Sequence, residues 1–132
     1  MANALFTAAK EEMITGSLDW TTDNRAILGD AADDTIDVAN DNMLDDVAPA
    51  YRVAVSGTIA SPTTVGGVAD AADTTVSSVT GDVFEHVLVY GHTGTESTSP
   101  LRVYIDTGSG LPGTPNGSDF LLTWNAGGIF AA

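Results

Sequence analysis

The chain has 132 residues, 43% of them hydrophobic, and no cysteine. This length fits a single domain with a buried core, and the lack of cysteine excludes disulfides, thiolate metal ligands and a cysteine nucleophile. Four basic residues stand against 18 acidic ones, for a formal net charge of -14. Because a surface this negative repels phosphate groups, we expect neither nucleic acid nor a membrane as a partner.

The first segment, 1–16, is predicted to form a short helix or arm. Over residues 3–15 the apolar side chains follow helical spacing, with Asn3 placed to cap the first turn and Gly16 to end the helix. We expect the apolar side to dock on the body of the same subunit or on a neighbour. The candidate interface residues on this side are Leu5, Phe6, Ala9 and Met13. The opening also lacks the pattern of a signal peptide, so we expect synthesis in the host cytoplasm.

From residue 17 to residue 132 the pattern is typical of β structure. Short apolar runs alternate with clusters of glycine, proline and small polar residues, as in sandwiches and barrels. The predicted strands are 25–28, 51–55, 74–79, 83–90, 101–107, 120–125 and 128–131. We therefore predict a mainly β, single-domain antiparallel β-sandwich or jelly-roll-like barrel with a short N-terminal helix.

Two of these strands carry informative patterns. In VFEHVLVY, 83–90, both alternating faces are largely apolar, which predicts a central strand that is covered on each side. In 101–107, apolar residues alternate with polar or charged ones, which predicts one buried and one solvated face. The glycine- and proline-rich stretch 106–119 predicts a hairpin connection to 120–125.

The sequence DTGSG at 106–110 matches the way an aspartic protease presents its catalytic carboxylate. Such a site needs two carboxylates that share a proton, so a chain of this length would have to contribute Asp106 to a homodimer. Too few residues follow Asp106 to build the flap and second loop of the small dimeric proteases. We interpret DTGSG as a strand end followed by a turn, and we predict no catalytic residue and no enzymatic activity.

Seven aspartates lie in GDAADDTIDVANDNMLDDV, residues 29–47, and clustered carboxylates attract hard cations. Aligned as an EF-hand loop, the calcium candidates are Asp30, Asp34 and Asp41, but alanine and threonine occupy a ligand position and the turn-glycine position. We favour a solvated acidic loop that leads into a short helical turn at 41–47. A weak surface Ca²⁺ or Mg²⁺ site is the alternative, and no metal is assigned.

The remaining candidates for chemistry have simpler interpretations. His86 and His92 have no marked third ligand, so we expect a half-buried strand histidine and a turn histidine rather than a zinc pair. The serines, Ser109 among them, occur in no nucleophile-elbow pattern. Aromatic residues at alternating strand positions are expected in the core rather than in a sugar-binding platform. No cofactor is predicted.

Two stretches carry a wider resemblance. One is the opening MANALFTAAKEEMITGSLDWTTDNRAILGD; the other, and the stronger, is 83–130, with SPL, YIDT, GLP, PNG and a late Trp followed by Ile-Phe. Together they cover most of the chain and resemble a group of small proteins encoded by tailed bacteriophages. The resemblance implies a structural role in the virion and transfers no catalytic residue.

Among virion parts, a small, mainly β, cysteine-free chain is similar to capsid decoration or cement proteins. This similarity implies a non-enzymatic protein on the capsid surface that needs a large complementary surface rather than a pocket. The expected partners are the major capsid protein and further copies of the chain in a homotrimer, and the expected function is to stabilise the shell. The alternative is a tail-tip or fibre-associated protein that binds a host receptor or glycan.

Overall fold

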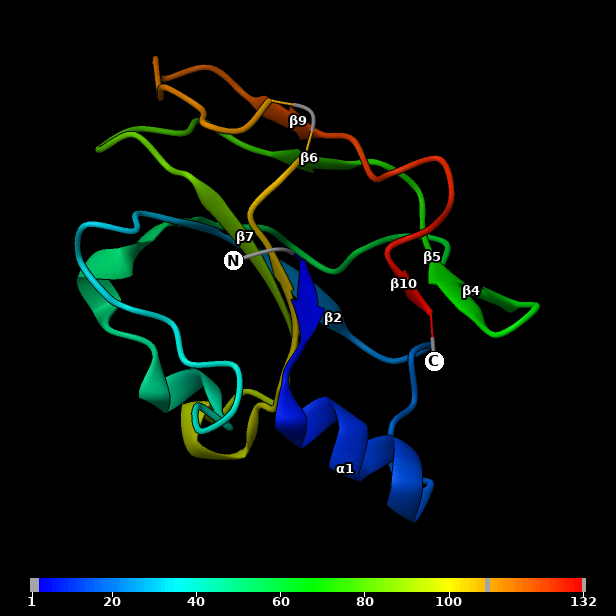
Figure 1. The fold of residues 1–132 in the computed structure, drawn as a ribbon. Helices are drawn as coiled ribbons and strands as arrows, with labels where there is room; N and C mark the ends of the chain where they lie inside the picture. Colours follow the sequence, from blue (N-terminus) through cyan, green and yellow to red (C-terminus); the bar gives the residue numbers. More distant parts are fainter. Residues whose placement is uncertain (1–2, 109, 132) are drawn as a thin grey trace.

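The structure is a computed structural model that describes residues 3–108 and 110–131 (Figure 1). It is mainly β, with antiparallel sheets and one short N-terminal helix, as predicted. The strands are β1 (Ala4–Leu5), β2 (Asn24–Gly29), β3 (Arg52–Val55), β4 (Thr63–Val65), β5 (Val68–Asp70), β6 (Thr74–Val76), β7 (His86–Gly91), β8 (Leu101–Ile105), β9 (Phe120–Leu122) and β10 (Phe130–Ala131). The helices are α1 (Thr7–Thr15) and the 3-10 helices η1 (Leu44–Asp46), η2 (Pro49–Tyr51) and η3 (Glu96–Thr98).

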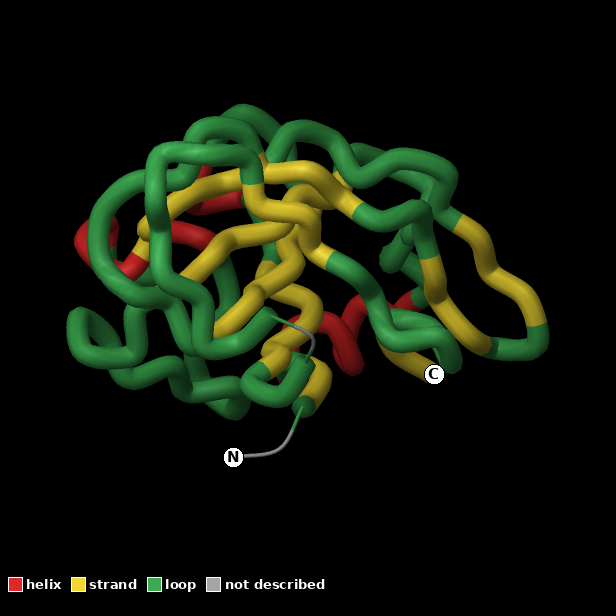
Figure 2. The backbone as a smooth tube through the Cα atoms, turned by 90° about the horizontal axis from the view of Figure 1, so that it is seen from above, coloured by secondary structure: helices red, strands yellow, loops and turns green. Residues whose placement is uncertain are grey.

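Five strands form the main sheet, in the order β1-β8-β7-β2-β3, and all neighbours are antiparallel. A second sheet has the order β10-β5-β4, and β6 pairs with β9 in a third. Figure 2 shows the strands of the main sheet in the middle of the molecule with long loops around them. The β6–β9 pair packs over one face of the main sheet, so the arrangement is sandwich-like, but the sheets do not close into a barrel.

The main sheet is buried on both of its faces. Along β7, Val87 and Val89 belong to one hydrophobic cluster, whereas Leu88 and Tyr90 belong to a second cluster on the opposite face. The first cluster includes residues of β6 and β9, and the second is completed by the segment 36–51 and by Phe6 before α1. The central, doubly covered position predicted for 83–90 is therefore confirmed, although the strand itself begins at His86.

The solvated face predicted for 101–107 is wrong. Arg102 and Tyr104 point to the side that was expected to face water, yet each is only 4% exposed. Tyr104 joins the second cluster, and Arg102 lies under α1, where it pairs with Glu12. Alternation along a strand predicts which side chains share a face, but it does not predict whether another element covers that face.

The N-terminal helix is shorter than predicted. Residues Ala4–Leu5 form β1, which pairs with β8, and α1 begins only at Thr7. Asn3 is therefore not the cap; the N-cap position is occupied by Phe6, which makes no side-chain cap hydrogen bond. The predicted end is confirmed, because Gly16 has a φ of 74° and its N–H bonds back into the last turn.

The candidate interface residues at the N-terminus lie against the body of the same chain. Phe6 and Ala9 are fully buried, with 0% of each side chain exposed. Leu5 and Met13 are half-buried. Packing within the chain thus occupies Phe6 and Ala9, while the following residue, Ile14, is 85% exposed.

The other strand predictions differ mainly in length and pairing. The strands expected at 74–79 and 120–125 are shortened to β6 and β9, which pair with each other. The hairpin predicted through 106–119 is wrong, because β8 pairs with β1 and β7 rather than with β9. The β4–β5 hairpin was not predicted, and in Figure 1 it extends from the side of the molecule.

Candidate functional site

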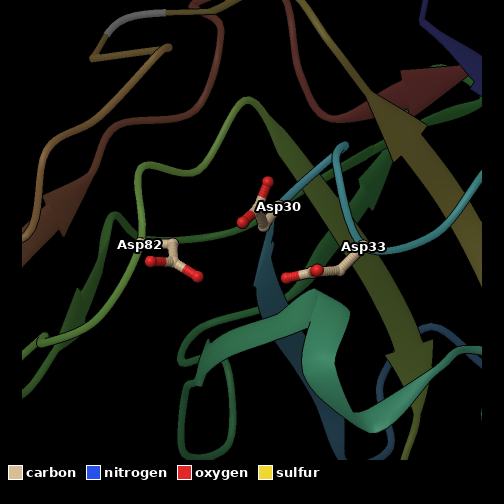
Figure 3. Close-up of side chains that lie close together, drawn as sticks. All are labelled: Asp30, Asp33 and Asp82. Atoms are coloured by element: carbon tan, nitrogen blue, oxygen red, sulfur yellow. The ribbon is translucent and has the colours of Figure 1, made fainter.

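Three aspartates gather beside the end of β2 (Figure 3). Asp30 directly follows the strand, Asp33 lies in the next turn and Asp82 lies in the loop before β7, with ligand oxygens all within 4.8 Å of one another. Asp30 is buried, whereas Asp33 and Asp82 are exposed. The pKa of Asp33 is raised, mainly by loss of hydration and to a smaller extent by the negative charge of Asp30.

These carboxylates, called the Asp30 cluster below, are suited to a hard cation, but only in part. Ca²⁺ takes about six to eight oxygen ligands, and three carboxylates with two exposed members would leave much of that set to water. Asp30 Oδ1 also accepts a hydrogen bond from the backbone N–H of Ala32 at 2.9 Å. The geometry is that of a weak surface site, and we assign no metal to it.

The calcium set predicted from the sequence is separated in the structure. Of Asp30, Asp34 and Asp41, only Asp30 belongs to the Asp30 cluster. Asp34 accepts a hydrogen bond from the backbone N–H of Ala48 at 2.9 Å, and Asp41 accepts one from the backbone N–H of Asp37 at 2.8 Å. Both carboxylates therefore hold loop backbone in place.

The DTGSG motif lies at the end of β8, where Asn3 holds it. Asn3 Oδ1 accepts hydrogen bonds from the backbone N–H groups of Asp106 (2.9 Å) and Thr107 (3.1 Å), and Asn3 Nδ2 donates to the carbonyl of Thr107 (3.3 Å). The strand ends at Ile105 and the chain turns, as predicted. Ser109 of the motif lies outside the described residues.

The two histidines do not converge. His86 lies at the start of β7 between two tyrosine hydroxyls, with Tyr51 Oη 3.1 Å from Nδ1 and Tyr104 Oη 3.1 Å from Nε2. Burial lowers the pKa of His86, which favours the neutral ring. A neutral imidazole has one donor and one acceptor nitrogen, so one tyrosine donates to the ring and the other accepts from it. His92 follows β7, and its backbone N–H bonds to the carbonyl of Asp23.

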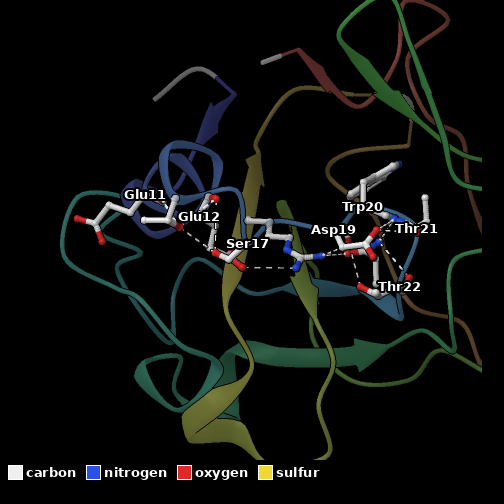
Figure 4. A network of polar contacts seen from close by, with 10 residues as sticks. Glu11, Glu12, Ser17, Asp19, Trp20, Thr21 and Thr22 are labelled. Carbon is white, nitrogen blue, oxygen red and sulfur yellow. Dashed lines mark hydrogen bonds and ion pairs between the residues drawn. The ribbon is translucent and has the colours of Figure 1, made fainter.

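A buried polar network joins α1 to the main sheet (Figure 4). The guanidinium of Arg102 lies 3.6 Å from Glu12 Oε2, and its Nη1 donates a hydrogen bond to Asn24 Oδ1. Nη1 also lies 3.5 Å from the carbonyl oxygen of Asp19. Gly91 on β7 leaves room for this group, because a Cβ there would lie 2.9 Å from Arg102 Cζ. One cation thus connects the helix, the following loop and two strands.

The other two arginines are also paired within the chain. Arg25 forms two hydrogen bonds to Asp23, of 3.1 Å and 3.0 Å, and Arg52 forms two to Glu96, of 2.9 Å each. These hydrogen bonds lower the pKa of the Asp23 and Glu96 carboxyl groups. Three of the four basic residues therefore neutralise partners within the chain, which leaves an excess of carboxylates for the outer surface.

A cavity of about 280 Å³ opens where the main sheet meets the segment after β9. Its walls include Ile105, Trp124 and Asn125. The indole N–H of Trp124 donates to the carbonyl of Ala72 at 3.0 Å, which fixes the ring. Aromatic and amide groups in one concave site could bind a small ligand that has both polar and apolar surface.

Sequence comparison assigns the chain to no family, since no protein-family model matches it and no curated protein matches it significantly. Within the described residues, no helix is both long and apolar enough to cross a bilayer. The charges, contacts and cavities of the chain itself are therefore the basis for inferring its function.

Proposed function

We propose that the protein is a structural protein of a tailed-bacteriophage virion, and specifically a capsid decoration protein. In this role a homotrimer binds the major capsid protein on the outside of the capsid and adds binding free energy that opposes the pressure of the packaged DNA. The sequence pattern over 83–130 supports the phage assignment, and the surface of the folded chain supports a role in protein contacts.

The observation that carries the proposal is that the arginines pair with acidic residues of the same chain. Because Arg25, Arg52 and Arg102 each pair with an acidic residue, carboxylates dominate the outer surface of a chain whose net charge is -14. Such a surface repels nucleic acid and favours a partner surface with basic side chains. Apolar side chains are exposed on the same chain, including Ile14 at 85% and Val65 at 77%. An acidic surface interrupted by apolar side chains suits binding to another protein.

The test uses parent capsids that lack this protein. Purified protein should bind these capsids in a defined number of copies and raise the temperature at which they release DNA, because binding only to the intact shell stabilises that state. Release of DNA can be followed with an intercalating dye during heating. An equal release temperature with and without the bound protein would contradict the proposal, and sedimentation of the free protein would test the trimer.

A receptor- or glycan-binding protein of the tail is the second candidate, and the cavity beside Trp124 favours it. The two functions differ in where the protein lies on the particle. Cryo-imaging of virions should show density over the whole shell for a decoration protein and only at the tail for a receptor-binding protein. Density confined to the tail would overturn the capsid proposal.

A further inference from the structure

An open groove of about 570 Å³ runs between the end of α1 and the β4–β5 hairpin. Its apolar lining includes Leu18, Trp20, Val68 and Phe130. Trp20 and Phe130 meet edge to face with their ring centroids 5.1 Å apart, and the indole N–H of Trp20 donates to the carbonyl of Asp70 at 2.9 Å. The aromatic part of the groove is therefore held in place, ready to receive an apolar side chain.

One side of the groove is a face of the β10-β5-β4 sheet. Thr64 of β4, Ala69 of β5 and Phe130 of β10 lie beside one another across the three strands, and all three line the groove. On the opposite wall, Met13 lines the groove and the next residue, Ile14, is 85% exposed. A groove that is open to solvent and crosses three neighbouring strands has the shape that receives an extended peptide.

The groove also carries a negative charge. Among the described residues that line it, Asp19 alone is charged. Its Oδ1 accepts hydrogen bonds from the backbone N–H and the hydroxyl of Thr21, at 2.9 Å and 2.6 Å, which favour the carboxylate form. The neighbouring Arg102 is buried and pairs with Glu12. A basic side chain from outside the molecule would therefore complement Asp19.

We propose that the groove between α1 and the β4–β5 hairpin is the docking site for an extended segment of the capsid partner, in which a large apolar residue lies next to lysine or arginine. This inference rests on the proposed function. The segment lies along the groove over the face of the β10-β5-β4 sheet, places its apolar side chain against Trp20 and Phe130, and brings its basic side chain to Asp19.

A second copy of this chain fits the groove less well. The chain has 18 acidic residues and four basic ones, and three of the basic residues are already paired internally. Another copy would therefore bring mainly negative charge toward Asp19, which disfavours the contact. The capsid partner is the occupant that the charges favour.

The test compares binding of wild-type protein and variants to parent capsids that lack it. Thr64→Asp places a second charge in the wall of the groove, and Asp19→Asn removes the groove charge while keeping a side-chain acceptor for Thr21. Asp45→Asn, on an exposed residue of η1, is the matched control for Asp19→Asn. We expect affinity to fall about tenfold for Thr64→Asp and about threefold for Asp19→Asn, with no change for Asp45→Asn. Urea unfolding confirms that each variant is folded.

The outcomes are distinguishable. If wild-type protein fails to bind the capsids, the proposed function fails and this inference fails with it. If wild-type protein binds and both groove variants bind equally well, the inference alone is overturned. If Thr64→Asp breaks up an oligomer of the free protein but leaves capsid binding unchanged, the groove is a contact between copies, which also overturns the inference.

Discussion

Gly29 is the position at which one added methyl group tests the packing most sharply. Gly29 ends β2, and the ring of Tyr51 crosses it so closely that a Cβ would lie 2.1 Å from Cζ and 2.2 Å from Cε1. Tyr51 is fully buried, so its ring cannot move into solvent without opening the second cluster. We predict that Gly29→Ala displaces the Tyr51 ring and destabilises the fold.

The size of the effect follows from two terms. Overpacking a well-packed core costs about 1–3 kcal/mol. Displacing the ring also breaks the 3.1 Å hydrogen bond between Tyr51 and His86, which contributes about 1 kcal/mol. We therefore expect Gly29→Ala to lower the free energy of unfolding by about 3 kcal/mol. This corresponds to a fall of about 10 °C in the melting temperature.

Urea denaturation followed by circular dichroism measures this change. Gly57→Ala is the matched control, because Gly57 is exposed and its added Cβ would meet nothing within 4 Å; it should stay within about 0.5 kcal/mol of wild type. In a Tyr51→Leu background, which lacks the clashing ring atoms, Gly29→Ala should lose most of its effect. Equal unfolding midpoints for the two glycine variants, or an undiminished effect in the Tyr51→Leu background, would refute the packing argument.

Two further predictions concern buried polar groups. Arg102→Met should destabilise the fold by about 3 kcal/mol because it leaves Glu12 without its cation, whereas Arg25→Gln at a partly exposed pair should change stability by less than about 1 kcal/mol. Similar losses for both in urea denaturation would contradict a structural role for the buried network. Burial lowers the pKa of His86 below its ordinary value of 6.5, so the unfolded chain binds a proton at this residue more readily than the folded chain does. The stability that comes from the neutral ring of the folded chain is therefore fully present above pH 6.5. It is lost as the pH falls from 6.5 through the lower folded-state pKa. Wild type should therefore lose stability relative to His86→Gln between about pH 7.5 and about pH 5, and a difference independent of pH would rule out this assignment.

Local patterns predicted the centre of the fold well and its borders poorly. The apolar residues on both faces of β7 predicted its central position, because a strand that is covered on both sides has apolar side chains at both alternating sets of positions. β4 and β5 were missed because their threonines and valines surround a Gly-Gly turn in an exposed hairpin, without a long apolar run. The turn-rich stretch 106–119 correctly indicated a bend, but turn residues do not specify which strand the chain pairs with next.

The candidate site was predicted only in part, because it depends on contacts between distant segments. Asp30 was singled out from its acidic run, but Asp82 lies far along the chain and joins it only through the fold. Asp34 and Asp41 have the right chemistry for a cation, yet backbone N–H groups occupy their oxygens. Composition predicts what a carboxylate can bind, and geometry determines which donor reaches it.

The aspartates of the loop over the second cluster have a consequence for redesign of the molecule. Several of them stabilise irregular backbone through hydrogen bonds. Asp37 accepts a hydrogen bond from the backbone N–H of Ala39, and Asp46 accepts hydrogen bonds from the backbone N–H groups of Asn42 and Met43. Replacing all of these aspartates with neutral residues to ease crystallisation or purification would remove the hydrogen bonds that hold the loop conformation as well as the negative charge. Asp45 accepts no hydrogen bond from a backbone group of the described residues, so it is the first aspartate of this loop to replace.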